Sequence, residues 1–464
     1  MRFSADLVHA VIKAYDVRGV VGEQIDVDFV RSVGAAFARL LREEGAENSR
    51  VVVGHDMRES SPGLAAAFAE GVCAQGLDVV QIGLASTDQL YFASGTVDCP
   101  GAMFTASHNP AKYNGIKLCR AGAKPVGQDT GLAAISADLV AGVPDWDGPR
   151  GSVTEQNLLE AYGAYLRGLV DLAGIRPLKV AVDAGNGMGG YTVPAVLGPL
   201  PVTVEPLYFE LDGSFPNHEA NPLDPKNLVD LQRHVTETGA DIGLAFDGDA
   251  DRCFVVDENG DPVSPSVITA LVAERELARA AQAGSEPGGA TVIYNLITSK
   301  IVPELVEKLG GTAVRTRVGH SFIKQTMAQT GAIFGGEHSA HYYFRDFWGA
   351  DSGMLAALHV LAALGGQDRP LSALTAAYRG YAASGEINST VSDQAERAAA
   401  VVDAFADRAL AVDRLDGVTV ELPGGAWFNL RASNTEPLLR LNVEAGTQGD
   451  VDALVTEILA IVRS

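Results

Sequence analysis

Residues 102–117, AMFTASHNPAKYNGIK, join a short apolar run to a polar loop. The apolar run over 102–104 predicts a strand, and Asn109-Pro110 predicts a turn soon after it. Ser107 is therefore expected on a loop at the end of a strand. Open α/β sheets place their chemistry at the carboxyl ends of their strands, so this stretch suggests both a fold class and a position for the site.

A serine hydroxyl is a weak nucleophile at neutral pH, so a covalent role for Ser107 requires a nearby base and cations to hold the transferred group. His108 and Lys117 lie within reach of the same loop. Ser, Asn and Pro are also common in ordinary turns, so the stretch alone does not decide between a nucleophile and a plain turn.

The rest of the chain repeats an alternation of strand and helix, which predicts α/β domains with parallel strands. The expected strands cover 51–53, 79–82, 179–182, 242–246, 252–256, 291–295, 332–334, 427–430 and 438–443. The expected helices cover 61–75, 130–139, 155–172, 227–238, 264–279, 299–309, 320 onward and 351–364. The stretch 142–151 is rich in Gly, Pro and Asp and predicts a linker. The stretch 365–370 is expected to be a hinge.

Length and composition exclude several classes of protein. A chain of 464 residues exceeds what one hydrophobic core usually serves, which predicts three or four domains. The formal charge of −23 argues against a nucleic-acid partner. No apolar run is long enough for a membrane span, and the N-terminus lacks a secretory signal, so a cytoplasmic protein is expected. The scattered cysteines, Cys73, Cys99, Cys119 and Cys253, predict neither a disulfide framework nor a zinc site.

An acidic loop directly follows the predicted strand 242–246 and has the sequence DGDADR over 247–252. Alternate carboxylates on an extended segment can turn their oxygens toward one point, and Asp247, Asp249 and Asp251 are hard ligands suited to Mg²⁺. A calcium loop is excluded because Arg252 occupies the position that requires Gly. Two alternatives stay open: a solvated acidic turn, and a phosphatase in which Asp247 is the nucleophile.

A glycine-rich run, DAGNGMGG over 183–190, has the glycine spacing of a dinucleotide-binding turn at Gly185, Gly187 and Gly190. Glu205 lies near the distance expected for a ribose-binding acid. A charge at Asp183 beside a pyrophosphate and a proline soon after the glycines argue against this reading. A nucleotide-dependent oxidoreductase is kept as a distant alternative.

Three further stretches offer groups for an anion or a sugar. Residues 15–19, YDVRG, predict a loop in which Arg18 clamps an anion or lies solvated at the surface. The stretch 336–341, GEHSAH, places Glu337, Ser339 and His341 at alternate positions, which would face one side of an extended loop and suit sugar hydroxyls.

The third stretch, RASNTEP over 431–437, lies between two predicted strands. Arg431 supplies a planar fork, and the neutral donors that follow it complete an anion cradle. These donors are Ser433, Asn434 and Thr435.

Taken together, four motifs in this order resemble the α-D-phosphohexomutases, the family of phosphomannomutase/phosphoglucomutase and phosphoglucosamine mutase. The motifs are 107–110, 247–252, 336–341 and 431–437, and the resemblance covers essentially the whole chain. It implies an α/β fold of four domains round a central cleft, three α/β domains with mixed sheets and a smaller C-terminal α+β lid. The expected boundaries are 1–148 with the phosphoserine loop, 149–259 with the metal loop, 260–368 with the sugar loop and 369–464 with the phosphate loop.

The resemblance also implies roles for single residues. Ser107 would carry a phosphate, and Mg²⁺ would be held by that phosphate with Asp247, Asp249 and Asp251. The implied catalytic residues are Ser107, Arg18, His108, Lys117 and His341. The implied substrate-binding residues are Tyr15, Arg252, His320, Glu337, Ser339, Arg431, Ser433, Asn434 and Thr435.

The implied activity is reversible phosphate transfer between O1 and O6 of mannose or glucose phosphates, with glucose or mannose 1,6-bisphosphate as the intermediate. Phosphoglucosamine mutase is the alternative within the family. The expected partners are small sugar phosphates, with no nucleic acid and no membrane, and the sequence leaves the oligomeric state undetermined. Two positions depart from the family pattern. Ala250 replaces a common Gly, which is expected to be harmless, and Leu296-Ile297 stand where dual-sugar members often carry a lysine.

Overall fold

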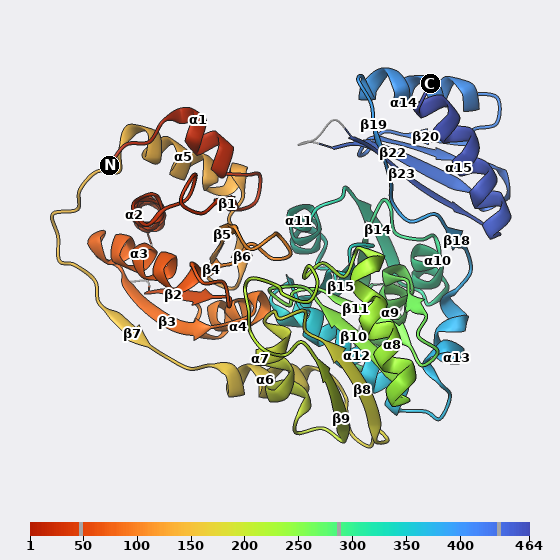
Figure 1. The fold of residues 1–464 in the computed structure, drawn as a ribbon, viewed down its shortest axis with the longest axis horizontal. Helices are drawn as coiled ribbons and strands as arrows, with labels where there is room; N and C mark the ends of the chain where they lie inside the picture. Colours follow the sequence, from red (N-terminus) through yellow and green to blue (C-terminus); the bar gives the residue numbers. More distant parts are fainter. Residues whose placement is uncertain (46–49, 285–288, 434–437) are drawn as a thin grey trace. The chain divides into compact units, whose positions relative to one another are not determined.

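The computed structural model describes residues 1–45, 50–284, 289–433 and 438–464 (Figure 1). These residues form two compact units, one of residues 1–264 with 339–374 and one of residues 265–338 with 375–464. Both units are built from mixed sheets and helices, which confirms the predicted α/β class.

The first sheet of unit one has the strand order β1-β5-β4-β2-β3-β7, with β6 on β5. Its strands are β1 (Val17–Val20), β2 (Arg50–His55), β3 (Asp78–Leu84), β4 (Gly101–Phe104), β5 (Tyr113–Arg120), β6 (Lys124–Pro125) and β7 (Val153–Glu155). Strands β4, β2, β3 and β7 are parallel, whereas β5 is antiparallel to both β4 and β1. The antiparallel pairing brings the end of β4 and the start of β5 to one edge, where the loop that carries Ser107 joins them.

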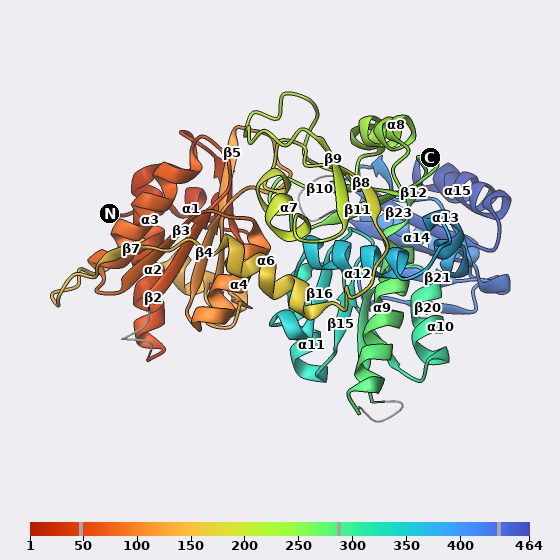
Figure 2. The same ribbon diagram turned by 90° about the horizontal axis from the view of Figure 1, so that it is seen from below.

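The helices of this part are α1 (Ala5–Val11), α2 (Val27–Glu43), α3 (Ser61–Ala74), α4 (Thr87–Val97), η1 (Gln128–Thr130) and α5 (Leu132–Ala141). Helices α2 and α3 lie side by side (Figure 2). A methyl group on Gly71 would lie 2.0 Å from the carbonyl oxygen of Arg31, so the two backbones approach too closely for a side chain. Both helices contribute to an apolar core that also includes Val51, Phe104 and Ile116 of the sheet.

The second sheet of unit one has the order β12-β11-β10-β8-β9. Its strands are β8 (Leu178–Asp183), β9 (Val202–Leu207), β10 (Ile242–Phe246), β11 (Cys253–Asp257) and β12 (Pro262–Val263), and its helices are α6 (Leu159–Leu169), α7 (Gly189–Leu197), η2 (Pro225–Leu228) and α8 (Val229–Thr238). Strands β8, β9 and β10 are parallel, and β11 returns antiparallel to β10. The acidic loop therefore lies at the carboxyl end of a buried parallel strand.

The later part of unit one contributes a largely buried helix, α12 (Gly353–Gly365). It also contains β16 (Tyr342–Phe344), η3 (Arg345–Phe347) and β17 (Ala350–Asp351), while α13 (Leu371–Thr375) ends it. A methyl group on Gly353 would meet the carbonyl carbon of Arg252 at 2.5 Å, so the start of α12 packs directly against the acidic loop.

Unit two contains a parallel group of strands, β14-β13-β15, and a C-terminal antiparallel sheet. The first group holds β13 (Thr291–Asn295), β14 (Thr312–Thr316), β15 (Phe334–Gly336), α9 (Pro265–Gln282), α10 (Ile301–Lys308) and α11 (His320–Thr330).

The C-terminal sheet has the order β18-β23-β22-β21-β20, with β19 on β23. Its elements are η4 (Ala376–Tyr378), β18 (Ala382–Ala383), β19 (Ile387–Thr390), α14 (Gln394–Phe405), β20 (Ala411–Asp413), β21 (Val418–Glu421), η5 (Pro423–Gly425), β22 (Trp427–Ala432), β23 (Leu438–Ala445) and α15 (Gln448–Val462). Its apolar core includes Val401, Phe405 and Phe428.

Several predicted elements are wrong in type or extent; the strand expected over 332–334, for example, covers Phe334–Gly336. Residues 17–20 are a strand rather than a loop, because they pair with β5 almost a hundred residues later. The helix expected over 155–172 begins only at Leu159, because residues 153–155 form β7 and pair with β3. By contrast, β10 and β13 have the predicted bounds of 242–246 and 291–295.

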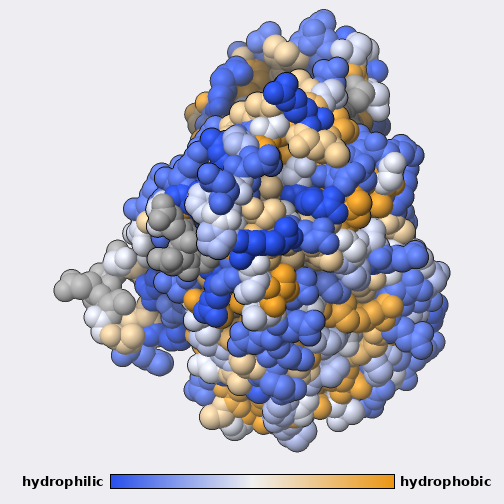
Figure 3. All heavy atoms as spheres, turned by 90° about the vertical axis from the view of Figure 1, so that its left-hand side faces the viewer, coloured by the Kyte–Doolittle hydropathy of each residue, from blue (hydrophilic) through white to orange (hydrophobic). Residues whose placement is uncertain are grey.

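In the part of the chain that the structure describes, no helix is long and apolar enough to cross a membrane. The face drawn in Figure 3 is mostly hydrophilic, with apolar side chains scattered among polar ones. Single exposed apolar side chains of this kind are normal for globular proteins.

Candidate active site

Ser107 lies on the loop between β4 and β5, which confirms its predicted position at the end of a strand. The residue is buried, and its backbone has a φ of 49°, in the left-handed region that non-glycine residues rarely adopt. Its Oγ donates to Oδ2 of Asp247 at 2.8 Å and lies 3.2 Å from Nδ1 of His108. The serine loop and the acidic loop thus meet at the serine hydroxyl.

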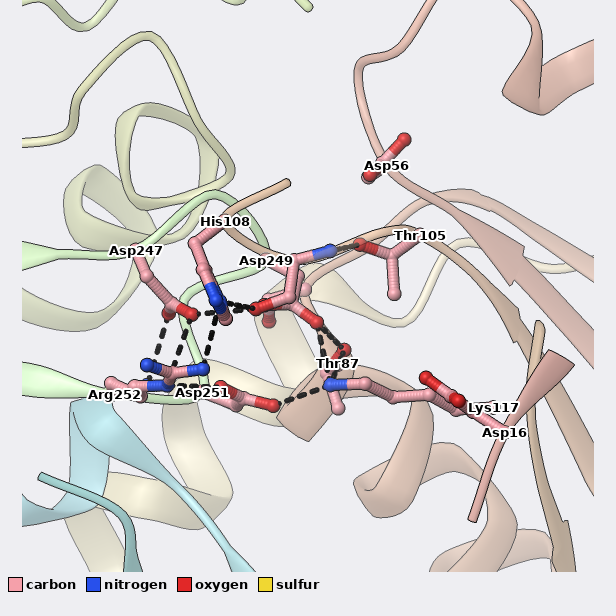
Figure 4. Close-up of polar contacts among 12 residues, drawn as sticks. Asp16, Asp56, Thr87, Thr105, His108, Lys117, Asp247, Asp249, Asp251 and Arg252 are labelled. Carbon is pink, nitrogen blue, oxygen red and sulfur yellow. Dashed lines mark hydrogen bonds and ion pairs between the residues drawn. The ribbon is translucent and has the colours of Figure 1, made fainter. Parts of the chain in front are cut away.

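The acidic loop is a tight turn, so the expected extended segment is wrong. The amide of Ala250 donates to the carbonyl oxygen of Asp247 at 3.0 Å, and Ala250 has a φ of 58°. The turn still brings the carboxylates together, because Asp247, Asp249 and Asp251 each offer an oxygen within 4.8 Å of the others (Figure 4). At Ala250 the chain places a side chain in the conformation that glycine adopts most easily.

The three carboxylates suit a hard cation. Oδ1 of Asp249 and Oδ1 of Asp251 are buried and accept no hydrogen bond from any residue that the structure describes. Burial together with the neighbouring Asp251 and Asp249 raises the pKa of Asp247 to about 7. Unpartnered buried carboxylate oxygens are costly, and oxygen ligands of this kind are those that Mg²⁺ prefers. The residues present therefore fit a magnesium ion.

Lys117 provides a positive charge on the other side of the acidic loop. Its Nζ lies 2.7 Å from Oδ2 of Asp249 and 2.6 Å from Oδ2 of Asp251. Burial would lower the pKa of Lys117, but the two carboxylates outweigh it and hold that pKa well above its usual value. Thr87, which the sequence interpretation missed, donates its hydroxyl to Oδ2 of Asp249 at 2.6 Å.

Arg252 connects the acidic loop to two histidines. Its Nη2 donates to Nδ1 of His108 at 2.8 Å, its Nε lies 3.4 Å from Oδ2 of Asp247, and Nε also donates to Nε2 of His341 at 3.2 Å. Burial and the charges of Arg252 and Arg18 lower the pKa of His108 well below its usual value. His108 is therefore neutral at neutral pH, with Nδ1 as the acceptor.

The predicted sugar-binding residues Ser339 and Glu337 belong to different units. In unit one, Oγ of Ser339 lies 3.1 Å from Nδ1 of His341. The extended loop expected here is wrong, because residues 338–340 form a turn in which Ala340 has a φ of 64°. In unit two, Glu337 is buried and its Oε1 accepts from Nδ2 of Asn295 at 3.1 Å.

Arg18 lies on β1 and reaches the serine loop. Its Nη1 donates to Oδ1 of Asn109 at 2.6 Å, and its Nη2 pairs with Asp16 at 2.5 Å. Arg18, which was expected to bind an anion or to be solvated, therefore contacts the side chain of Asn109 on the serine loop. Tyr15 lies half-buried just before β1.

The predicted anion cradle lies on the C-terminal sheet of unit two. Arg431 is on β22, and its Nη2 lies 3.5 Å from Oε2 of Glu386. Arg440 lies directly opposite Arg431 on β23, and its Nη1 is 3.5 Å from Oε1 of Glu386. The sequence interpretation missed Arg440 and Glu386. The amide of Ser433 donates to the carbonyl oxygen of Leu438 at 2.8 Å. Asn434, Thr435 and the side chain of His320 lie outside the described residues.

The glycine run over 183–190 packs against the acidic loop. A methyl group on Gly187 would lie 2.7 Å from the carbonyl oxygen of Gly248, and the amide of Met188 donates to that oxygen at 2.9 Å. A methyl group on Gly190 would lie 2.2 Å from the carbonyl oxygen of Phe209. Close backbone packing therefore explains Gly187 and Gly190, whereas Gly185 has a φ of 51°, a conformation that glycine adopts most easily.

Comparison with known proteins agrees with the motifs. Four family models match the chain: phosphoglucomutase/phosphomannomutase alpha/beta/alpha domain I over residues 9–140, domain II over 160–260, domain III over 264–381 and the C-terminal domain over 386–461. The predicted boundaries between the domains stay predictions.

Full-length relatives are similar throughout. The chain is 40% identical to a phosphomannomutase of Escherichia coli K12 over 450 residues, 95% of each chain. It is 34% identical to a phosphoglucomutase of Neisseria gonorrhoeae over 472 residues, 99% of this chain and 98% of the relative. The crystal structure of a phosphoglucomutase/phosphomannomutase family protein from Burkholderia thailandensis has a TM-score of 0.87 and 32% identity, and the match covers 100% of this chain and 98% of the other. The chain therefore belongs to the phosphoglucomutase/phosphomannomutase family, whose members are phosphohexomutases, enzymes of the isomerase class.

Proposed function

We propose that this chain transfers phosphate reversibly between O1 and O6 of mannose and glucose phosphates, through a phosphoserine at Ser107 and a hexose 1,6-bisphosphate. The observation that carries the proposal is the contact between the Ser107 hydroxyl and Oδ2 of Asp247 at 2.8 Å. A serine hydroxyl buried against a carboxylate cluster, with Lys117 and Arg252 around it, has the surroundings that phosphoryl transfer requires. The names of the relatives, phosphomannomutase and phosphoglucomutase, support the substrate class.

The magnesium ion of the proposed reaction would be held by Asp247, Asp249 and Asp251 with an oxygen of the phosphate on Ser107. When bound, it would neutralise charge that develops on the transferred phosphate. Lys117 contributes a second positive charge, because it contacts Asp249 and Asp251 from the side of β5. The chain has a net charge of −23, but the electrostatic potential at the site is set mainly by nearby groups. Lys117 and Arg252 can therefore attract an anionic sugar phosphate there.

Other groups of unit one hold the reacting residues in place. Arg252 donates to the neutral ring of His108 and so fixes that ring beside Oγ of Ser107. Arg18 holds the loop through Asn109. His341 is the proposed proton carrier, because histidine is the side chain that most often acts as a general acid or base and its Nε2 lies 3.6 Å from Asp251.

Recognition of the sugar is proposed to rest on O3 and O4. The bisphosphate must bind in two orientations related by a half-turn, which exchanges O3 with O4 and moves the substituent at C2. Glu337 and Ser339 would form hydrogen bonds with O3 and O4 in both orientations. A site that bound the C2 substituent tightly would accept the bisphosphate in only one orientation. The substrate's own phosphate would bind Arg431, Ser433, Asn434 and Thr435, with His320 and Tyr15 completing the binding residues.

A side-by-side assay of mannose, glucose and glucosamine 1-phosphates, with trace hexose 1,6-bisphosphate and saturating Mg²⁺, tests this function. We expect kcat/KM for mannose and glucose 1-phosphates within about tenfold, or ~1.4 kcal/mol, because they differ only at C2. Glucosamine 1-phosphate is expected to be worse, since its ammonium group would meet the cations that hold phosphate. If glucosamine 1-phosphate is the best substrate, the enzyme is a phosphoglucosamine mutase and the proposed specificity is wrong.

A further inference from the structure

Arg58 lies just before α3 and is almost completely buried, with 1% of its surface exposed. Its guanidinium donates to four backbone carbonyl oxygens of one loop. Nη2 donates to Ser107 at 2.9 Å and to Asn109 at 2.7 Å, while Nη1 donates to Pro110 at 3.0 Å and to Tyr113 at 3.1 Å. A single side chain therefore holds the loop on both sides of its turn.

The partner of Arg58 contributes to the same network. Asp56 has no exposed surface, and its Oδ2 lies 3.2 Å from Nε of Arg58. The amide of Asp56 donates to the carbonyl oxygen of Phe104 at 2.9 Å, at the end of β4, and Oγ1 of the next residue, Thr105, accepts from the amide of Ser107 at 2.9 Å. The amide and the carbonyl of Ser107 are thus both held, one through Thr105 and the other by Arg58.

The four hydrogen bonds from Arg58 to the loop, called the Arg58 clamp below, hold a segment of strained backbone. Ser107 has a φ of 49°, and a non-glycine residue keeps such a conformation only where its surroundings enforce it. The same conformation directs Oγ toward Oδ2 of Asp247. Arginine suits the task because its planar fork presents several donors in fixed directions, which a lysine cannot do.

We propose that Arg58 is a positioning residue: it holds Ser107 in the left-handed conformation that places its hydroxyl at the acidic loop. The proposal rests on the function proposed above. It assigns Arg58 no contact with substrate, because all its hydrogen-bonding nitrogens are used on the loop and on Asp56. Loss of the clamp is expected to act on phosphoryl transfer to and from Ser107, with no effect on binding of the sugar phosphate.

The test compares Arg58→Met and Arg58→Lys with Arg167→Met as a matched control. Arg167 also donates to two backbone carbonyls, of Ala195 at 2.7 Å and Val196 at 3.1 Å, but these lie in α7 away from the serine loop. Single-turnover phosphorylation of Ser107 from glucose 1,6-bisphosphate is followed by intact-protein mass, alongside kcat and KM for glucose 1-phosphate. Thermal unfolding of each variant reports stability.

We expect Arg58→Met to slow phosphorylation and lower kcat by about a hundredfold, the cost of misplacing a reacting group by about 1 Å, with KM unchanged within about twofold. Arg58→Lys should fall between wild type and Arg58→Met. Arg167→Met should lose stability while keeping the wild-type rate of phosphorylation. A wild-type rate in Arg58→Met would overturn the proposal, as would an equal loss of rate in Arg167→Met.

Two further experiments test the role of Arg58 if the Arg58→Met variant cannot be assayed for activity. If Arg58→Met does not fold, Thr105→Val removes the acceptor for the amide of Ser107 at nearly constant volume, and it should lower kcat without raising KM. Hydrogen exchange of the peptide that covers 105–113 needs no activity, and it should be faster in the Arg58 variants than in Arg167→Met. Wild-type exchange of that peptide in the Arg58 variants would contradict the proposed role of Arg58, whether or not Ser107 is phosphorylated. Absence of phosphate on Ser107 in the wild type would instead refute the proposed function.

Discussion

Oγ of Ser107 and Oδ2 of Asp247 lie 2.8 Å apart, although 140 residues separate them in the chain. The contact depends on a close approach of two loops. A methyl group on Gly248 would lie 2.4 Å from the carbonyl oxygen of Ser107, so the backbone of the serine loop rests directly on the acidic loop. Gly187 also packs against Gly248, because a methyl group on Gly187 would lie 2.7 Å from the carbonyl oxygen of Gly248. Backbone packing thus sets the distance between the serine and the carboxylates.

Gly248→Ala is expected to separate the two loops and to lower kcat by about a hundredfold or more, because a displacement of about 1 Å at the reacting atoms costs that much. Real Cβ atoms do not approach a backbone oxygen to 2.4 Å, so one of the loops must shift. Steady-state kinetics of the purified variant check this.

Gly168→Ala is the matched control for that substitution. Gly168 lies in α6, and apart from its chain neighbours and the backbone of its own helix, a methyl group there would meet no atom of the described residues within 4 Å. Because glycine is unfavourable inside a helix, this variant should be stabilised by about 0.5–1 kcal/mol with unchanged kinetics. Normal activity in Gly248→Ala would show that the contact between the loops is not needed for catalysis.

Asp249→Asn should raise the Mg²⁺ concentration that gives half-maximal activity by about tenfold or more, because one charged ligand is lost. Direct titration of Mg²⁺ by calorimetry should show the same weakening. Asp257→Asn is the control, since Asp257 lies at the other end of β11 and its Oδ1 accepts from the backbone amides of Asn259 and Asp261. Identical Mg²⁺ dependence in Asp249→Asn and wild type would remove Asp249 from the metal site.

Local patterns predicted the site loops, whereas contacts between distant residues were not predictable. A buried apolar strand followed by polar residues predicts a loop at a sheet edge, which is why the positions of Ser107 and Asp247 were expected. The conformation of the acidic loop was not predictable, because alternate carboxylates converge equally well on an extended segment and in a turn. Arg58 and Thr87 were missed because their partners lie 49 and 162 residues away, at Ser107 and Asp249, and nothing in the sequence nearby marks those contacts.

Asp88 should make the stability of the fold depend on pH. The carboxylate is buried and accepts hydrogen bonds from Tyr162 and Ser352, and burial raises its pKa from 3.8 to about 6. Between these values the folded chain keeps a proton that the unfolded chain has released, so the contribution of Asp88 to the free energy of unfolding falls as pH rises through this window. The fall amounts to about 3 kcal/mol, since each pKa unit corresponds to ~1.4 kcal/mol.

Asp88→Asn removes the titrating group and keeps an acceptor for the hydroxyls. The difference in melting temperature between wild type and Asp88→Asn, followed from pH 4 to pH 7, should therefore shift in favour of the variant as pH rises. A difference that stays constant over this range would contradict the raised pKa of Asp88.

Arg431→Met should raise KM for the sugar phosphate about tenfold or more, since a charge-assisted contact to phosphate is lost. Among the residues that the structure describes, none accepts a hydrogen bond from its buried Nε, so the guanidinium keeps donor capacity for a ligand. The same assay on Arg233→Met, which removes an exposed arginine paired with Asp230 on α8, supplies the control. An unchanged KM in Arg431→Met would exclude Arg431 from substrate binding.

Mapping of the phosphorylated peptide shows whether Ser107 carries the transferred phosphate. The protein is incubated with glucose 1,6-bisphosphate, digested and analysed by mass spectrometry, with Ser107→Ala treated in parallel. We expect an acid-stable phosphate on Ser107 in the wild type, with neither phosphate nor mutase activity in Ser107→Ala. A phosphate on Asp247 that is labile to alkali and hydroxylamine, still present in Ser107→Ala, would contradict it and establish an aspartyl-phosphate route instead.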